Sequence, residues 1–190
     1  METLAISTKT KWNIDAANSQ IGFSVKYLVF TTTRGSFKEF EANIYTSGDD
    51  FLSLQIDFRI NAESIDTGNE MRDKHLKSAD FFDIEKYKKI NFTSDKIEVA
   101  DKEGNYILYG DLTIKGIKKQ VKLNVESGGT IKDPWGAEKS LFRITGKINR
   151  KDWELNWNAV LETGGVLVGD DVWINCDVQL IKQRETDTIH

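Results

Sequence analysis

The chain has 190 residues, the length of one ordinary domain, and 39% of them are hydrophobic, which is enough to bury a sizeable core. Its 26 Lys and Arg residues and 30 Asp and Glu residues give a net charge of −4 and are spread without a basic block. This composition does not favour a nucleic-acid partner. No segment approaches the roughly 20 apolar residues of a membrane-spanning helix, and the N-terminal METLAISTKTKW lacks the apolar run of a secretory signal. We therefore expect a cytoplasmic protein without a membrane span.

Most of the chain alternates apolar and polar residues, as strands with one buried face do. The clearest case is 52–60, and in 37–45 the alternation slips once between Phe37 and Phe40, which predicts a β-bulge. Gly128 and Gly129 interrupt the alternation that starts at Val121, so we expect that strand to end before them. The predicted strands are 21–27, 37–45, 52–60, 90–99, 106–114, 121–125, 142–148, 153–157 and 172–180.

This regular series of strands, with turn signals such as DPWG at 133–136 between them, predicts an all-β fold. An antiparallel barrel and a sandwich both fit the pattern. In a sandwich the aromatic residues, 11% of the chain, would fill the core. An eight-stranded barrel has an interior that holds either side chains or one small ligand, and periodicity alone does not separate these possibilities.

Residues 64–92 are the one long stretch that reads neither as a strand nor as a simple turn. Thr67 and Glu70 have the spacing of a capping box, which predicts a short helix from about Gly68 to about Lys77. We expect a helical crossing segment near residues 67–87, with Phe81 and Phe82 closing and shaping one end of the fold.

Candidate catalytic residues are few. Arg72, Asp73 and His75 lie within one helical turn, and an enzyme could use His75 as a general base oriented by Asp73 or Asp80. On a short helix such residues more often form caps and surface pairs. Besides His75 the chain has only the terminal histidine, so no histidine-based metal site is expected.

Two further features have plain structural interpretations. Cys176, the sole cysteine, lies in a strand pattern and is expected to be a small buried hydrophobic residue. Asp170 and Asp171 lack the surrounding spacing of a calcium loop and are expected to be polar hairpin residues.

Six segments taken together resemble the YceI-like family, in the order usual for that family and over residues 12–181. The resemblance is carried by WNIDAANSQIGFSVKY, SIDTGNEMRDKHLKSADFFDIEKYKKINFTS, GDLTIKG, DPWG, INRKDWELNW and GVLVGDD. It implies an extended, lipocalin-like, eight-stranded antiparallel β-barrel of residues 12–182, flanked by flexible segments at 1–11 and 183–190. It also implies an interior that binds a long isoprenoid or similar lipid, no catalytic activity, no cofactor, and a possible homodimer.

The chain departs from the family pattern at several positions. Asn18 and Tyr27 stand where the family commonly has histidine, Lys88 where it has proline, and Glu154 where it has glycine. Tyr27 adds bulk to a strand face, so the pocket is expected to be reshaped there.

The function expected from the resemblance is non-catalytic binding, transport or storage of an isoprenoid or similar amphiphilic lipid inside the barrel. The alternatives are an enzyme that uses Arg72, Asp73 and His75 on a lipid-like substrate, and a packed structural or stress-related domain without a ligand. The predicted lipid-binding residues, on the assumption that the more apolar face of each strand points inward, are Phe23, Val25, Leu54, Ile56, Phe58, Phe81, Phe82, Phe92, Leu108, Leu112, Phe142, Ile144, Trp153, Trp157 and Ile174.

Overall fold

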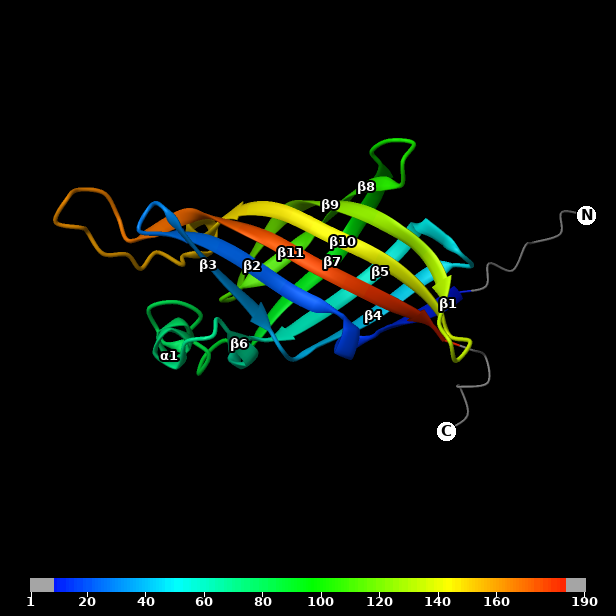
Figure 1. Ribbon diagram of the computed structural model, residues 1–190, viewed down its shortest axis with the longest axis horizontal. Coiled ribbons are helices and arrows are strands. Elements are labelled where there is room, and N and C mark those ends of the chain that lie inside the picture. Colours follow the sequence, from blue (N-terminus) through cyan, green and yellow to red (C-terminus); the bar gives the residue numbers. More distant parts are fainter. Residues whose placement is uncertain (1–8, 184–190) are drawn as a thin grey trace, which may run out of the picture.

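Antiparallel strands wrap around one elongated interior, and a short α-helix lies at one end of it, in a computed structural model that describes residues 9–183 (Figure 1). The expected flexible segments, 1–11 and 183–190, fall largely outside the described residues, although Lys9 to Lys11 belong to the first strand and the Gln183 amide donates to the Lys11 carbonyl. The strands are β1 (Lys9–Ile14), β2 (Gln20–Tyr27), β3 (Thr31–Phe37), β4 (Phe40–Ser47), β5 (Asp50–Asn61), β6 (Ile65–Asp66), β7 (Lys89–Val99), β8 (Asn105–Ile114), β9 (Ile117–Lys132), β10 (Glu138–Asn149) and β11 (Val168–Lys182). The helices are η1 (Ala16–Asn18), η2 (Ala62–Ser64), α1 (Glu70–Lys77) and η3 (Arg150–Trp153).

The sheet closes into an eight-stranded barrel because two of its eight positions are each filled by two successive strands. β1 and β2 both pair with β11, on either side of a bend at η1. β4 pairs with β1, and β3 pairs with β2. β6 pairs only with the end of β3, and β5 pairs with β7. From β7 to β11 each strand pairs with the next along the chain, so this is an up-and-down barrel. The all-β, lipocalin-like barrel expected from the sequence is confirmed.

The predicted bulge between Phe37 and Phe40 is wrong. The chain breaks at Lys38 and Glu39, where β3 ends and β4 begins, and the two strands continue one long bent path with different partners. A slip in alternation marks either event, because both insert residues outside the pleat.

At Gly128 and Gly129, where the sequence predicts the end of a strand, the structure has a β-bulge within one strand. β9 runs on to Lys132, and its register against β10 shifts because Gly129 faces Leu141 while Ser127 faces Phe142. Gly128 is therefore the extra residue of a β-bulge. Gly129 follows with a φ of 85°, a conformation that glycine adopts without strain.

The predicted strand at 153–157 is also wrong. Trp153 is the last residue of η3 (Arg150–Trp153). Asn149 caps this 3₁₀ turn, because its Oδ1 accepts from the Lys151 amide at 3.0 Å. The left-handed Glu154 ends the 3₁₀ turn. Trp153 and Leu155 are both buried beneath this turn, so their alternation reflects a folded loop rather than a strand face.

The helix α1 begins at Glu70, and its N-cap is Asn69 rather than Thr67. Asn69 Oδ1 accepts from the Arg72 amide at 3.0 Å. The Thr67 hydroxyl oxygen instead accepts from Arg72 Nε at 2.7 Å and donates to Asp73 Oδ1 at 2.6 Å. The helix ends at Lys77 as predicted. None of the described helices is long and apolar enough to cross a membrane.

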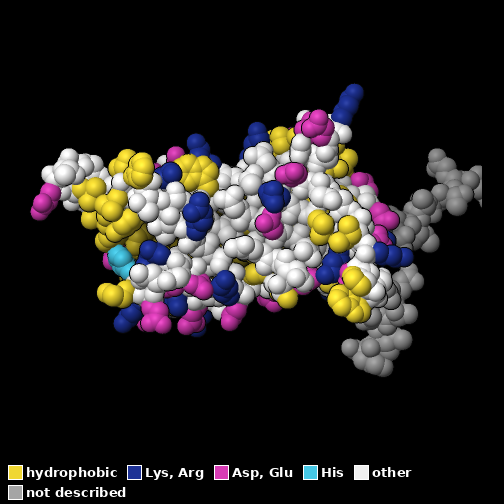
Figure 2. Space-filling model, in the orientation of Figure 1, with side chains coloured by type: hydrophobic (Ala, Val, Ile, Leu, Met, Phe, Trp, Pro, Cys, Tyr) yellow, Lys and Arg dark blue, Asp and Glu magenta, His cyan; other side chains and the backbone are white. Residues whose placement is uncertain are grey.

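The end of the barrel opposite α1 is closed by aromatic side chains. Phe51 packs against Trp12 and Phe142, with ring centroids 5.1 Å apart in both pairs. Trp12 Nε1 donates to Thr46 Oγ1 at 2.9 Å, which satisfies the indole within the core. On the face shown in Figure 2, acidic and basic side chains are mixed, and most of the hydrophobic side chains lie towards the two ends.

Candidate functional site

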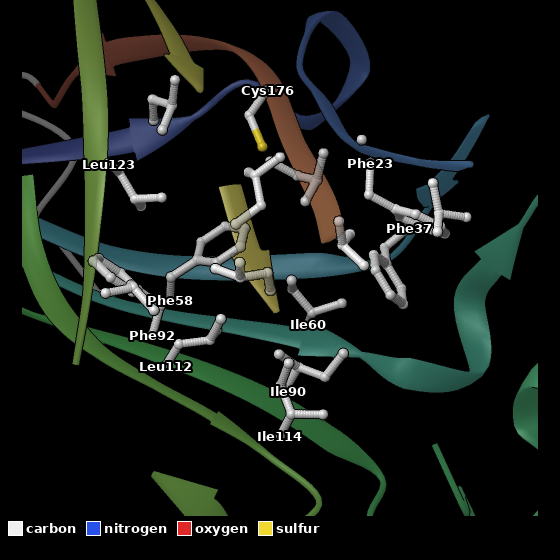
Figure 3. Close-up of a pocket in the computed structure, with 18 of the residues that line it drawn as sticks. Phe23, Phe37, Phe58, Ile60, Ile90, Phe92, Leu112, Ile114, Leu123 and Cys176 are labelled. Carbon is white, nitrogen blue, oxygen red and sulfur yellow. The ribbon is translucent and has the colours of Figure 1, made fainter. Parts of the chain in front are cut away.

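The barrel encloses a cavity of about 780 Å³. This volume lies within the usual range for small-molecule sites. Phe58, Phe92, Leu112 and Cys176 come from different strands and point into the same space (Figure 3). The walls are almost entirely apolar, so the interior suits a hydrophobic ligand.

Two glycines help to keep the interior hollow. The Phe92 ring lies on Gly110, where a Cβ atom would stand 2.5 Å from Cζ of that ring. The Phe23 ring lies in the same way on Gly35, and a Cβ atom there would also stand 2.5 Å from Cζ. These aromatic side chains therefore lie against the wall instead of crossing the barrel.

The structure brings all of the predicted lining residues to the cavity wall except Trp153. Trp153 is buried outside the wall, and its Nε1 donates to the Leu112 carbonyl at 3.0 Å. The alternation over 153–157 predicts a strand with Trp153 on its inner face, whereas Trp153 belongs to η3. The other wall residues missed from sequence mostly extend the same strand faces, such as Ile60, Leu123 and Val178.

The cavity reaches the surface beside α1. Tyr27 and Met71 line it and are also exposed to solvent. Thr67 and Asn69 add polar groups at this opening, which we call the mouth. Tyr27, which replaces an expected histidine, thus lies at the mouth and leaves the deeper cavity open.

Three aromatic side chains predicted from sequence shape the cavity near the mouth. The Phe82 ring packs edge-on against Phe37, with centroids 6.0 Å apart. The Phe81 and Trp157 rings lie 5.5 Å apart. The segment after α1 therefore contributes directly to the cavity wall.

Arg72, Asp73 and His75 do not form one catalytic unit. Arg72 donates to both Thr67 Oγ1 and the Thr67 carbonyl, at 2.7 and 2.8 Å. Asp73 accepts from the Thr67 amide and hydroxyl. These two side chains therefore hold the loop before α1 in place.

His75 lies at the mouth and is oriented by Asp80 rather than by Asp73. Its Nε2 lies 2.9 Å from Asp80 Oδ2. Its ring packs edge-on against Trp157 at 4.5 Å and against Phe81 at 5.1 Å.

Arg150 is a buried cation at the cavity that the sequence did not reveal. Its side chain donates to the carbonyls of Leu155, Trp157 and Gly169. Burial lowers the pKa of Arg150, and Asp170, 3.8 Å away, opposes that effect. These bonds tie the loop after η3 to β11, although nothing in INRKDW distinguishes Arg150 from the neighbouring surface charges.

Asp170 also lies 3.3 Å from Lys151 Nζ, so it belongs to an ion-pair group. Within residues 9–183 no three His, Cys, Asp or Glu side chains come together as metal ligands. Cys176 is buried in the cavity wall, and burial raises the pKa of its thiol to about 11.

Comparison with known proteins places this barrel in a family. The profile of the YceI-like domain matches residues 12–180. UPF0312 protein SAS2572 of Staphylococcus aureus is 38% identical over 164 residues, which cover 86% of this chain and 92% of the relative. The chain belongs to the YceI-like family.

Solved structures share the YceI-like fold. A Campylobacter jejuni YCEI protein is 32% identical, covers 90% of this chain and 96% of its own, and superposes with a TM-score of 0.72. BcnA of Burkholderia cenocepacia, at 24% identity, covers 87% and 98% with a TM-score of 0.75. A polyisoprenoid-binding domain from Saccharophagus degradans has 13% identity and a TM-score of 0.61, with coverage of 90% and 98%. The last two likenesses are likenesses of fold.

Proposed function

We propose that this YceI-like protein binds a long-chain isoprenoid or similar amphiphilic lipid in its barrel, and carries or stores it without chemical change. The observation that carries this proposal is the apolar cavity of about 780 Å³, whose lining includes polar groups at the mouth. A chain in the barrel and a head group at the mouth would match these two environments. The polyisoprenoid-binding description of the Saccharophagus degradans domain, which shares the fold, agrees with this ligand class.

The apolar wall can supply enough binding free energy without directional contacts. Each methylene removed from water contributes about 0.8 kcal/mol. Ordering the lipid opposes part of this gain. Selectivity would then depend on the length and shape of the cavity, with head-group preference set by the polar groups around α1.

The proposal is tested with a pair of adjacent substitutions on β5. Ile56 lines the cavity, whereas Gln55 is on the outer face and exposed. Ile56→Trp should fill part of the cavity and lower lipid content, measured by native mass spectrometry and organic extraction of the purified full chain. Gln55→Trp should retain the wild-type lipid content. Circular dichroism melting confirms that both variants are folded.

A wild-type protein that carries no lipid after purification, and takes none up from added polyprenol, would contradict the proposal. Equal lipid content in the two folded variants would contradict the assigned site.

The non-catalytic part of the proposal rests on the mouth residues. Arg72 and Asp73 are engaged with Thr67, so within residues 9–183 the side chain that orients His75 is Asp80. Lipid recovered after prolonged incubation should have unchanged mass. Lipid conversion that His75→Gln abolishes would instead support the enzyme hypothesis.

The cytoplasmic location and the homodimer stay predictions. Fractionation of cells and light scattering of the purified chain test them.

A further inference from the structure

Large apolar side chains project into solvent around the mouth. Val29 is 76% exposed, Phe30 91%, Met71 85% and Val160 85%. They come from three separate segments: the β2–β3 turn, α1, and the loop before β11. Figure 2 shows hydrophobic side chains gathered at the end of the molecule that carries these segments in Figure 1. We call these four residues the apolar rim.

The apolar residues of the turn between β2 and β3 do not favour the backbone conformation that this turn has. Leu28 and Val29 have φ values of 55° and 66°, in the left-handed region. This conformation is unfavourable for a β-branched residue, and tight hairpins prefer Asn and Gly at such positions. The segment Leu28-Val29-Phe30 therefore combines a strained backbone with exposed apolar side chains.

The β2–β3 turn is hydrogen-bonded to the loop before β11. The Leu28 amide donates to the Leu167 carbonyl at 2.9 Å. The loop itself is held as a small hairpin by a bridge between Val160 and Val166. The turn is thus held beside the base of the loop, where Val160 and Val166 pair.

The apolar rim surrounds the route by which a ligand enters or leaves. Met71 belongs to the rim and also lines the cavity. A lipid chain that left through water would expose its methylenes one after another, each with a free-energy cost. A rim embedded in a bilayer would let the chain pass directly between two apolar environments.

We propose that the apolar rim docks on the surface of a lipid bilayer, with Val29, Phe30, Met71 and Val160 inserted at the head-group level. This inference rests on the proposed function, because a lipid ligand is what makes the bilayer the fitting partner. A bilayer accepts residues on separate protruding tips, whereas a second copy of the chain would need a continuous self-complementary face.

The charges near the apolar rim decide whether binding needs anionic lipids. Two basic residues, Lys26 and Lys74, and two acidic residues, Glu70 and Glu162, are exposed and lie within three residues of a rim residue in the sequence. Because these charges offset one another, binding should depend on apolar insertion and need no anionic lipid. Glu162 lies between Val160 and Val166 and keeps the insertion shallow.

The test uses the purified full chain and vesicles of phosphatidylcholine alone. Wild-type protein should float with the vesicles, with little change in 0.5 M salt. The double variant Val29→Asn, Phe30→Ser should reduce the partition coefficient at least tenfold. Asn tolerates the left-handed conformation, so this variant should remain folded.

The matched control is Trp135→Ser, which removes an apolar side chain that is 86% exposed on the β9–β10 turn, away from the mouth. It should float as the wild type does. Failure of the wild type to float, or an equal loss in the control, would overturn the inference. A dimer that the double variant converts to monomer, with no flotation, would also overturn it and assign the rim to a second copy.

Lipid content measured on the same samples separates this inference from the proposed function. A double variant that keeps its lipid but no longer floats supports both. A wild type that floats but holds no lipid supports docking and contradicts the proposed function.

Discussion

Cys176 shows how the interior controls the chemistry of a single residue. Its thiol faces the apolar cavity, and burial raises its pKa from 9.0 to about 11. The folded state therefore favours the neutral thiol. The same group ionises at lower pH in the unfolded chain, where it is in water.

This difference predicts a loss of stability at alkaline pH. Below pH 9 both states hold the proton and the contribution is fully present. Between pH 9 and 11 the unfolded state releases the proton first, so the free energy of unfolding should fall by up to about 2 to 3 kcal/mol. Urea unfolding at pH 8 and at pH 10.5 measures the change.

Other groups also titrate in this range, so the comparison is with Cys176→Val. The variant should show a shallower loss over the same pH interval. Identical pH profiles for the two proteins would mean that the thiol is not ionised preferentially in the unfolded state.

At the scale of elements, η3 ends in a conformation that its sequence does not favour. Glu154 has a φ of 57°, and it occupies a position where the family resemblance leads us to expect glycine. Its carbonyl accepts from Lys115 Nζ at 3.3 Å, a bond that does not depend on the Glu154 side chain.

Glu154→Gly should therefore stabilise the protein by about 0.5 to 1 kcal/mol, because glycine adopts the left-handed conformation without the steric cost. The gain is limited by the greater backbone freedom of glycine in the unfolded chain. Thermal melting measures it. Glu154→Ala removes the same side chain but keeps the strain, so a rise in melting temperature shared by both variants would point to the carboxylate instead.

The elements that sequence predicts well are those whose pattern is local. Residues 54–60 alternate because one pleat sets both faces of that part of β5, and the strand lies where the pattern places it. The parity changes before Leu54, where the register against β4 shifts, so Phe51 rather than Leu52 lines the cavity. Trp153, Leu155 and Trp157 alternate equally well, yet a 3₁₀ turn and a loop produce that spacing. Thr67 lost its predicted capping role to Asn69 because Asp73 and Arg72 occupy its hydroxyl.

The candidate site divides in the same way. The wall could be predicted, since inward-facing residues follow strand parity. Arg150 and Met71 could not, because only the folded chain brings their segments to the cavity.

At the scale of the whole molecule, an aromatic group lies at the end of the barrel opposite the mouth. Phe51 stands between Trp12 and Phe142 at the closed end and lines the cavity. A chain that enters at α1 would end against this group. The depth of the cavity should then set the longest chain that fits.

Phe51→Ala should extend the cavity and shift the bound lipids towards longer chains. Removing a fully buried phenylalanine ring costs about 3 to 5 kcal/mol of stability. Because Phe51 is half-buried, the cost here should be smaller. Extraction and mass spectrometry give the chain-length distribution. Leu52→Ala, which truncates an exposed neighbour, is the control. If folded Phe51→Ala binds lipids with the same chain-length distribution as the wild type, Phe51 does not limit the length of the bound chain.

The break at Lys38 and Glu39 makes the strand pairing unequal along the barrel axis. Within residues 9–183, the outer edge of β3 pairs with the two residues of β6 alone, whereas β4 pairs with β5 over most of its length. Separating β3 from the α1 segment would therefore break fewer backbone hydrogen bonds than separating β4 from β5 at the aromatic end. A bulky head group could pass the mouth by parting β3 from the α1 segment, without breaking the ladders that hold the remaining strands in a ring.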